Sequence, residues 1–434
     1  MRIVVVGTGF VGLVTGAGLA DFGNEALCVD VDPAKIAKLG RGEIPFYEPG
    51  LQDLVARNVR ERRLRFGSSL EEATKWGELI FLCVGTPSGP RGEADLSQVF
   101  AAAKTIAGSL TGYRLIVQKS TVPVGTNEKL RASIAKQAKR SARFDVASNP
   151  EFLREGTAVD NFMRPDRIVI GADTAKARTM LRDLYRPLYL IETPVVVTTV
   201  RTAELIKYAS NAFLATKISF INEMANLADA LGADVHDVAK AMGLDRRIGP
   251  KFLHPGPGYG GSCLPKDTKA LRHFASGAGV ELRVVGASIQ ANDAQLQVAV
   301  SKVRSFLKGR GPHTVGILGL SFKPETDDMR EAPSLGIIQA LRRRSTNIRV
   351  YDPVVRAATP GAPKDVTFAT NAYDAAKGAD VLVIVTEWNE FRRLDLVRIR
   401  RVMRRRAIVD LRNVYDPPAV RRLGFAYTSV GRPA

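Results

Sequence analysis

With 434 residues, 45 % of them hydrophobic and 25 % charged, the chain has the composition of a folded protein of two or three domains rather than of a disordered segment. It has no run of eighteen apolar residues and no export signal, so we expect no membrane span and a cytoplasmic protein. The net charge of +19 raises the question of a polyanionic partner. Aromatic residues do not alternate with the arginines, so solvated helix faces are expected and nucleic acid is not an expected partner.

The three cysteines lie far apart, at Cys28, Cys83 and Cys263. An odd number at wide spacing argues against a disulfide framework and against a zinc site, so we expect no metal. Cys28 and Cys83 stand in the apolar runs "ALCVDV" and "IFLCVG", where a thiol is expected to be inert core packing.

The N-terminal third of the chain alternates strands and helices. "RIVVVG" predicts a strand, "GTGFVG" a tight turn, "LVTGAGLADFG" a helix and "EALCVDVD" a second strand. Further strands are predicted over 78–87, 114–123 and 144–150. This alternation predicts a parallel sheet with helices on both faces, in a first domain over residues 1–200.

The pattern changes at residue 201, where a stretch without glycine or proline predicts one long helix to about residue 231, roughly 45 Å in length. Asp234 is expected to cap the next helix, and a mostly helical domain is predicted over 201–300. The long helix is a candidate for a subunit interface, although a buried helix that connects domains explains the pattern nearly as well.

The order of apolar strands predicted for the first domain recurs after residue 311. Apolar strands are predicted over 314–323, 348–353, 379–387 and 406–414, in the same order as their N-terminal counterparts. The expected fold class is therefore α/β, with two Rossmann-like, doubly wound parallel-sheet domains joined by a long central helix and a helical dimerisation domain. The second Rossmann-like domain is expected over 311–434.

Gly7, Gly9 and Gly12 follow the first strand in the G-x-G-x-x-G spacing and open the first helix. Glycine permits the tight turn, and the helix N-terminus can receive a pyrophosphate. Asp30 closes the second strand, where a carboxylate accepts hydrogen bonds from ribose hydroxyls and repels a 2′-phosphate. The motif predicts NAD rather than NADP; the alternative is a glycine turn that serves only helix–strand packing.

Several polar residues stand where chemistry is expected. Lys207 and Asn211 share one face of the long helix, and burial of such a lysine is costly unless an anion meets it, although a lysine that reaches solvent fits the spacing too. Glu151, Glu155 and Thr121 follow neighbouring strands, at the edge where parallel sheets form ligand crevices. Polar residues that merely cap loops are the alternative.

The segment "GPGYGGSCLPKD" surrounds Cys263 with glycines, which we expect to allow a ligand to approach the backbone closely. Pro265 suits a first helical turn, so Cys263 is expected at a helix N-terminus, where thiolate is favoured. A buried, inert thiol is the alternative. A nucleophilic thiol together with NAD indicates oxidation of an alcohol through an aldehyde to an acid, because the thiol adds to the aldehyde and the adduct is oxidised again.

The segments "GTGFVG", "STVPVGT", "NPEFLREGTA", "AELIKYASNAFLATKISFINE", "GPGYGGSCLPKDT" and "GLSFKPETDDMREAPS" resemble, in their order along the whole chain, the UDP-glucose/GDP-mannose dehydrogenase family. The resemblance implies a homodimer formed through the central helix, NAD on the first domain and a UDP-sugar reaching the last. It favours the UDP-glucose branch and a four-electron oxidation to UDP-glucuronate with two NAD⁺ per turnover.

The resemblance also implies residue roles. Cys263 would be the nucleophile, Asp267 would handle a proton or water, Lys207 would stabilise the oxyanion, Asn211 would fix the sugar, and Thr121 and Glu151 would hold water. The residues implied to contact the cofactor are Gly7, Gly9, Gly12, Asp30, Lys35, Thr86, Thr121, Glu155 and Arg330. The residues implied to contact the substrate are Glu151, Lys207, Asn211, Arg247, Lys251, Tyr259, Gly260, Lys323 and Arg412.

Other functions remain open from the sequence. The same chemistry on GDP-mannose or a UDP-hexosamine is the nearest alternative. A one-step NAD dehydrogenase with a structural Cys263, and a non-catalytic basic nucleotide-binding protein, are the others.

Overall fold

The computed structural model describes residues 1–307, 309, 312–342 and 346–433. The chain folds into two compact units, residues 1–210 with 273–279, and residues 211–272 with 280–434. None of the helices over the described residues is long and apolar enough to cross a membrane. The predicted division into three domains, at residues 200 and 300, stays a prediction.

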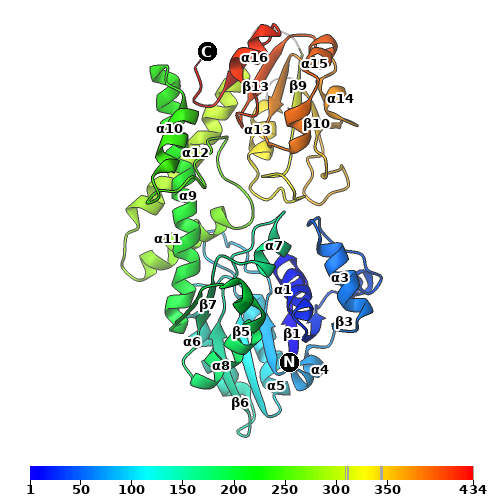
Figure 1. The fold of residues 1–434 in the computed structure, drawn as a ribbon, viewed down its shortest axis with the longest axis vertical. Coiled ribbons are helices and arrows are strands. Elements are labelled where there is room, and N and C mark those ends of the chain that lie inside the picture. Colours follow the sequence, from blue (N-terminus) through cyan, green and yellow to red (C-terminus); the bar gives the residue numbers. More distant parts are fainter. Residues whose placement is uncertain (308, 310–311, 343–345, 434) are drawn as a thin grey trace. The chain divides into compact units, whose positions relative to one another are not determined.

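The first unit is built on one eight-stranded sheet, in the order β3-β2-β1-β4-β5-β6-β7-β8 (Figure 1). Neighbouring strands are parallel except for β6 and β7, which are antiparallel. The strands are β1 Arg2–Val6, β2 Glu25–Val29, β3 Leu64–Gly67, β4 Leu79–Leu82, β5 Tyr113–Gln118, β6 Arg143–Ser148, β7 Ile168–Gly171 and β8 Val195–Thr198.

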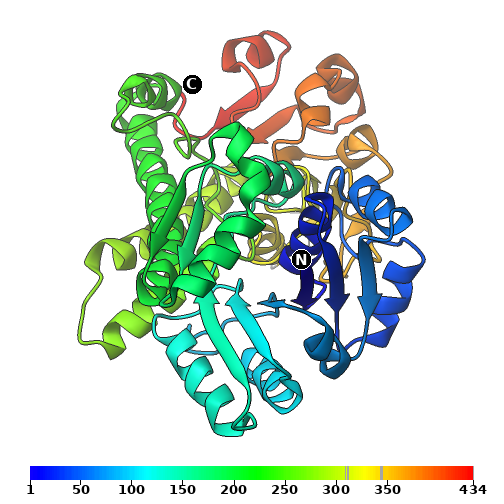
Figure 2. The same ribbon diagram turned by 60° about the horizontal axis from the view of Figure 1, so that its bottom comes forward.

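Helices cover both faces of this sheet (Figure 2). They are α1 Phe10–Asp21, α2 Pro33–Gly40, α3 Leu51–Arg60, α4 Leu70–Trp76, α5 Ser97–Ser109, α6 Thr126–Gln137, α7 Ala158–Met163, α8 Ala175–Leu184 and the 3-10 helix η1 Arg186–Ile191. Successive residues of β1 serve opposite faces: Ile3 and Val5 pack in a core with α1 and α3, whereas Val4 and Val6 pack in a core with α5 and α6. Strands buried on both faces read as continuous apolar runs, which is why the sequence predicted β1, β2, β4, β5 and β6.

Helix α9, Val200–Leu231, is continuous across the boundary between the units. It is followed by α10 Val235–Leu244, α11 Leu264–Gly277 and α12 Arg283–Arg304. The carboxylate of Asp234 accepts a hydrogen bond from the His236 N–H at 2.8 Å, so the predicted cap of α10 is confirmed.

The second unit carries a six-stranded sheet in which every pair is parallel, in the order β11-β10-β9-β12-β13-β14. Its strands are β9 His313–Leu318, β10 Thr346–Tyr351, β11 Thr367–Phe368, β12 Val381–Ile384, β13 Ala407–Asp410 and β14 Ala426–Ser429. Its remaining helices are α13 Pro333–Leu341, α14 Ala372–Ala376, the 3-10 helix η3 Asn389–Arg393, α15 Leu396–Val402 and α16 Pro417–Arg422. The order repeats that of β3-β2-β1-β4-β5-β6, so the predicted pair of Rossmann-like sheets is confirmed.

The repeat extends to a carboxylate at the end of each second strand. Asp352 follows β10 as Asp30 follows β2. Asp352 is 1 % exposed and accepts hydrogen bonds from the Leu320 N–H at 2.8 Å and the Trp388 indole N–H at 3.2 Å, and also from the N–H groups of Ser321, Val354 and Val355. The oxygens of this second carboxylate thus accept hydrogen bonds from the protein itself.

Candidate active site

The glycine turn of the first unit has the geometry that a dinucleotide site requires. Gly7 has φ +96°, and a Cβ there would lie 2.8 Å from the Cys83 carbonyl oxygen. A Cβ at Gly12 would lie 1.9 Å from the Gly7 carbonyl oxygen. At Gly9, the residue that precedes α1, an added Cβ would meet nothing within 4 Å. Two glycines are therefore needed to form the turn, while the third leaves open space at a helix N-terminus, which fits a pyrophosphate.

Asp30 lies beside this turn. Its carboxylate accepts hydrogen bonds from the Thr8 N–H and the Thr8 hydroxyl, both at 2.8 Å, and lies 3.2 Å from the Lys35 ammonium. Burial acts to raise the pKa of Asp30, but the Thr8 and Lys35 contacts outweigh it and the net shift is downward. The carboxylate is therefore ionised at neutral pH, and the Lys35 ammonium lies beside it.

A buried ion pair joins the end of β6 to α9. The Lys207 Nζ lies 2.8 Å from Glu151 Oε1, and the two side chains are 4 % and 7 % exposed. Burial acts to raise the pKa of Glu151, but Lys207, the Leu153 N–H and Lys119 lower it further than burial raises it. The interpretation of Lys207 as a surface lysine is therefore wrong, because the helix turns this side chain toward a carboxylate of its own unit.

The other residues predicted at this sheet edge lie on neighbouring loops. Thr121 follows β5 and is half-buried, and its carbonyl accepts a hydrogen bond from the Thr86 hydroxyl at 3.0 Å. Glu155 is half-buried in the loop before α7. The loops after β4, β5 and β6 thus carry polar residues at one edge of the sheet, as parallel strands dictate.

Two buried glutamates that the sequence did not single out fix these loops. Glu204 of α9 accepts hydrogen bonds from the Gly125 N–H at 2.7 Å and the Asn127 N–H at 2.9 Å, at the start of α6. Glu48 accepts hydrogen bonds from the N–H groups of Gly156 and Ala158, at the start of α7. Their partners are distant in sequence, so local pattern gave no signal.

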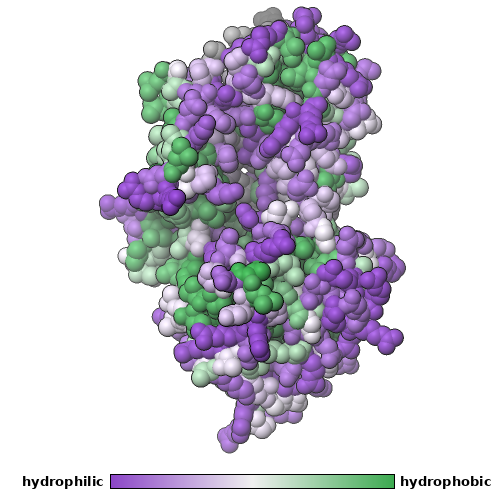
Figure 3. Space-filling model, viewed as in Figure 1, coloured by the Kyte–Doolittle hydropathy of each residue, from purple (hydrophilic) through white to green (hydrophobic). Residues whose placement is uncertain are grey.

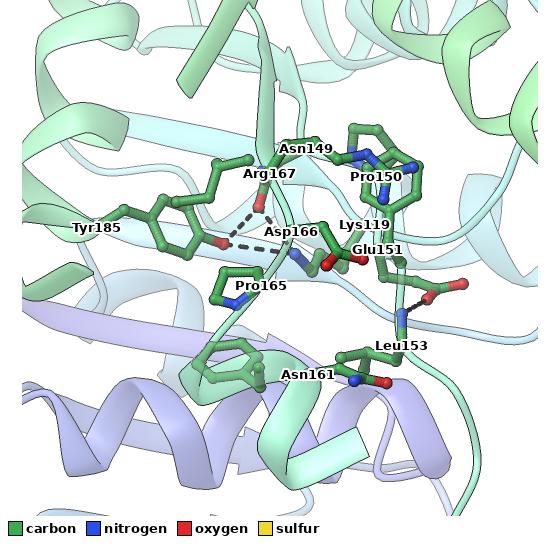
Figure 4. A pocket seen from close by; sticks show the side chains of 13 residues that line it. Lys119, Asn149, Pro150, Glu151, Leu153, Asn161, Pro165, Asp166, Arg167 and Tyr185 are labelled. Atoms are coloured by element: carbon green, nitrogen blue, oxygen red, sulfur yellow. Dashed lines mark hydrogen bonds between the residues drawn. The ribbon is translucent and has the colours of Figure 1, made fainter. Parts of the chain in front are cut away.

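Glu151 also lines a pocket in the first unit, together with Lys119, Asn149 and Tyr185 (Figure 4). Lys119, which follows β5, is 5 % exposed, and its ammonium donates to Asn149 Oδ1 at 3.0 Å and to the Tyr185 hydroxyl at 3.4 Å. The Tyr185 hydroxyl also donates to Asn149 Oδ1, at 2.6 Å. The sequence prediction missed Lys119; the available signal was a lysine directly after an apolar strand, in "LIVQKS".

The second unit holds the candidate thiol. Cys263 immediately precedes α11, its carbonyl accepts the Asp267 N–H at 2.9 Å, and its side chain is half-buried. By contrast, Cys28 and Cys83 are buried, and burial raises the pKa of Cys83 to about 12. The predictions of two core thiols and one at a helix start are confirmed, and the helix N-terminus favours thiolate at Cys263.

Asp267 connects this thiol loop to α9. The side chain is 1 % exposed, accepts a hydrogen bond from Asn211 Nδ2 at 2.6 Å, and lies 2.6 Å from the Lys266 ammonium. Since Asn211 stands four residues after Lys207 in one continuous helix, α9 presents both on one face.

Other parts of the protein occupy the space beside two glycines near Cys263. A Cβ at Gly260 would lie 2.3 Å from the Glu331 carbonyl oxygen, and one at Gly261 would lie 2.7 Å from the Phe322 ring. Gly261 also has φ +84°. The close approach that requires glycine at these two positions is therefore made by the segment between β9 and α13, which the expectation of ligand approach alone did not foresee.

The remaining candidates of the second unit differ in exposure. Tyr259 is buried, and burial raises its pKa. Arg412 is mostly buried, donating to the Val385 and Phe322 carbonyls at 2.9 and 3.1 Å and forming an ion pair with Glu387 at 3.1 Å. Lys323 is half-buried and Lys251 is exposed.

Two predicted arginine contacts are surface groups paired to near neighbours. Arg247 lies 2.6 Å from Asp245, and Arg330 lies 2.8 Å from Asp328. The structure therefore brings together Glu151 with Lys207, and Asn211 with Asp267.

Comparisons with known proteins match the whole chain. Models of the UDP-glucose/GDP-mannose dehydrogenase family match in chain order: the NAD binding domain over residues 1–189, the central domain over 201–294 and the UDP binding domain over 316–417. The chain is 49 % identical to a UDP-glucose 6-dehydrogenase of Rhizobium meliloti, covering 100 % of both chains.

Solved structures agree. The chain is similar to a UDP-glucose dehydrogenase from Pyrobaculum islandicum, with a TM-score of 0.91 and 38 % identity over 100 % of this chain and 98 % of that one. It is also similar to a UDP-D-ManNAc dehydrogenase from Pyrococcus horikoshii, with a TM-score of 0.86 and 28 % identity over 100 % of this chain and 99 % of that one. The two neighbours differ in the sugar they are named for.

Proposed function

Because the chain belongs to the UDP-glucose/GDP-mannose dehydrogenase family, we propose that it oxidises C6 of UDP-glucose twice and releases UDP-glucuronate, reducing two NAD⁺. The observation that carries the proposal is Cys263 at the start of α11, next to the buried Asp267–Asn211 pair. The identity to a relative named UDP-glucose 6-dehydrogenase favours glucose as the sugar.

NAD⁺, which the Gly7–Gly12 turn and Asp30 would hold, would supply the hydride acceptor for each of the two oxidations of the sugar carbon. The Cys263 thiolate adds to the aldehyde carbon between them, and the oxidised adduct is a thioester that water cleaves to the acid and the free thiol. The Lys207 ammonium stabilises the oxyanion on that carbon, and Asp267 takes or returns protons. Asn211 fixes the sugar, while Thr121 and Glu151 hold water.

The binding roles are part of the same proposal. We assign the cofactor to Gly7, Gly9, Gly12, Asp30, Lys35, Thr86, Thr121, Glu155 and Arg330. We assign the UDP-sugar to Glu151, Lys207, Asn211, Arg247, Lys251, Tyr259, Gly260, Lys323 and Arg412. Residues 1–200 would hold NAD, 201–300 the thiol loop and 311–434 the UDP moiety. A reducing, cytoplasmic location suits a mechanism that needs a thiolate.

A stoichiometric assay tests this function. The protein is offered UDP-glucose, GDP-mannose and a UDP-hexosamine with NAD⁺, and NADH formed per sugar consumed is counted. We expect two NADH and an acid from UDP-glucose. One NADH with accumulating aldehyde would contradict the thiol mechanism. Turnover of another sugar alone would mean that this sugar, and not UDP-glucose, is the substrate.

Asp30→Ala should weaken NAD binding by about 10- to 100-fold, because charged hydrogen bonds are lost, and should affect NADP less since Lys35 is released from its carboxylate partner. Dissociation constants of both cofactors measure this. Asp32→Ala is the matched control: Asp32 caps α2 through the N–H groups of Ala34 and Lys35, so its loss costs about 1 kcal/mol of stability without changing cofactor preference. Equal losses for both cofactors in Asp30→Ala would refute the ribose role.

We also propose a homodimer formed through α9. Large apolar residues of this helix are exposed at Leu205, Phe213, Phe220, Leu227 and Leu231. Their spacings of seven, eight and four residues keep them on one side of a helix. Figure 3 shows green, hydrophobic residues at the surface on the side where Figure 1 draws α9. An unpaired apolar stripe of this length is typical of an interface between subunits.

Phe220→Asp should raise the dimer dissociation constant by about 30-fold or more, since a charge would enter an apolar contact. Light scattering during size-exclusion chromatography over a concentration series measures it. Val397→Asp, the same change at an exposed apolar residue of α15, is the control and should leave the mass unchanged. An unaltered dimer in Phe220→Asp would exclude this face.

A further inference from the structure

The starting observation is an ammonium buried without a carboxylate partner. Lys119 is 5 % exposed, and its two hydrogen-bond partners, Asn149 and Tyr185, are neutral. In the part of the chain that the structure describes, no ion pair joins Lys119 to an acidic residue. Burial of a charge is costly without such a partner. Packing alone therefore does not explain why an ammonium group stands at this position.

The position of Lys119 relates it to the proposed active site. One of its hydrogen bonds goes to Asn149, two residues before Glu151 (Figure 4). The side-chain amide of Asn149 in turn donates to the Val169 carbonyl at 2.9 Å. Lys119 therefore connects the end of β5 to the loop that carries Glu151. It lies close enough to Glu151 and Lys207 to interact with both charges.

The charges of Lys119, Lys207 and Glu151 do not cancel one another. Two ammonium groups, on Lys119 and Lys207, share one carboxylate, that of Glu151. Asp166 and Arg167, which line the same pocket as Lys119 and Glu151, add one charge of each sign. With Lys119 protonated, these five groups together therefore carry an excess of one positive charge. With Lys119 neutral, Glu151 and Lys207 cancel each other.

We propose that Lys119 is a positioning residue for the Glu151–Lys207 pair, which fixes the Glu151 loop and supplies the second positive charge that leaves Lys207 able to stabilise an oxyanion. The inference rests on the proposed function. Lys119 does not touch the substrate; it acts through Glu151 and Lys207.

The charge of Lys119 changes within an accessible pH range. Burial lowers its pKa to about 8; Cys83 and Glu151 oppose this shift, and Lys207 adds to it. The groups that interact with it are Cys83 after β4, Glu151 after β6, Tyr185 after α8 and Lys207 on α9, and Asp166 and Arg167 line the same pocket. Cys83 and Tyr185 have raised pKa values and stay neutral near pH 8, so the titration there belongs to Lys119.

The test compares the wild type with Lys119→Gln and Lys119→Met, using UDP-glucose and NAD⁺ under conditions in which chemistry limits kcat. Glutamine keeps a hydrogen-bond donor without the charge. We expect kcat to fall by about 10- to 100-fold at pH 7 in both variants, with little change in KM. The ratio of wild-type to variant kcat should decline toward one as the pH rises through 8, because the wild type then loses the same charge.

Tyr185→Phe is the control that keeps the ammonium: it removes the hydrogen bond to Asn149 and the 3.4 Å hydrogen bond from Lys119, and leaves the hydrogen bond from Lys119 to Asn149 in place. Its kcat ratio to the wild type should not depend on pH. A pH-independent ratio in Lys119→Gln, or the same profile in Tyr185→Phe, would overturn the proposal in favour of simple anchoring. If neither Lys119 variant folds, a wild-type kcat that does not fall between about pH 7.5 and 9 overturns it.

A second readout needs no turnover. The unfolded chain binds one more proton than the folded protein between the folded pKa of about 8 and the unfolded value of 10.5, so Lys119 makes the wild-type unfolding free energy rise with pH in that window. Lys119→Met should lack this rise, and equal slopes would overturn the assignment of the charge. If the wild type does not oxidise UDP-glucose, the proposed function fails, and this measurement still decides the charge state.

Discussion

Cys263→Ser is expected to stop net formation of the acid, lowering the steady-state rate by on the order of 10³-fold or more, as loss of a nucleophile does. A serine hydroxyl adds to the aldehyde weakly, and an ester that does form is cleaved slowly because an alkoxide leaves poorly. Counting NADH, and looking for an ester on the protein by mass spectrometry, checks the result. NAD affinity should be unchanged, since the glycine turn and Asp30 are untouched.

Cys28→Ala is the matched control for this experiment. Cys28 is fully buried in β2, and burial raises the pKa of its thiol, so its removal should cost stability without affecting the stoichiometry. Normal acid formation by Cys263→Ser, with two NADH per sugar, would remove the thiol from the mechanism.

Lys207→Met should produce the second large loss, in stability as well as activity. Glu151 would remain buried without its 2.8 Å partner, and breaking a buried ion pair by removing one member costs about 3–5 kcal/mol. The rate should also fall by about 100-fold or more, because a charge that stabilises the oxyanion is lost. Denaturant unfolding and steady-state kinetics measure the two effects.

The pH dependence of the unfolding free energy shows whether the loss of stability comes from the unpaired Glu151. In the wild type the pKa of Glu151 is below its unfolded value of 4.5, so its stabilising contribution is present above pH 4.5 and is lost as the pH falls through the folded pKa. In Lys207→Met, burial should place the pKa above 4.5, and the unfolding free energy should then fall as the pH rises past that value.

Two further variants separate structure from chemistry. Lys207→Met combined with Glu151→Leu should recover most of the stability and none of the activity, since both charges are gone. Lys217→Met changes another lysine of α9, whose ammonium donates to the Ile248 carbonyl, and should leave kcat near the wild-type value. Full activity in the double variant would exclude this pair from catalysis.

Much of the fold was predictable because its signals are local. The apolar runs of β1, β4 and β5, the turn at Gly7 and the cap at Asp234 depend on neighbours within a few residues, and all were predicted. The repeat of strand order followed from the same signals occurring twice. Strands β3, β7 and β8 were missed. Strand β8 lies at the sheet edge with Val195 and Val196 exposed, so it lacks the buried surroundings of the central strands.

The site was less predictable, because its decisive contacts join residues far apart in the chain. Helical spacing placed Lys207 beside Asn211, yet it could not say whether the lysine met solvent or Glu151. Glu204 and Lys119 likewise have partners on other elements, which only the packed sheet brings near. Motif spacing marked Cys263 correctly, because a thiol before a proline-containing first turn is itself a local feature.

Asp352 has a consequence for how variants of this protein are interpreted. Asp30 and Asp352 occupy equivalent places in the two sheets, but the second carboxylate is held by backbone and indole donors of its own unit. A screen scored only by product formation would class both as binding residues. A thermal-shift screen would separate them, because loss of Asp352 lowers the melting temperature whether or not nucleotide is added, whereas loss of Asp30 mainly abolishes the protection that added NAD confers.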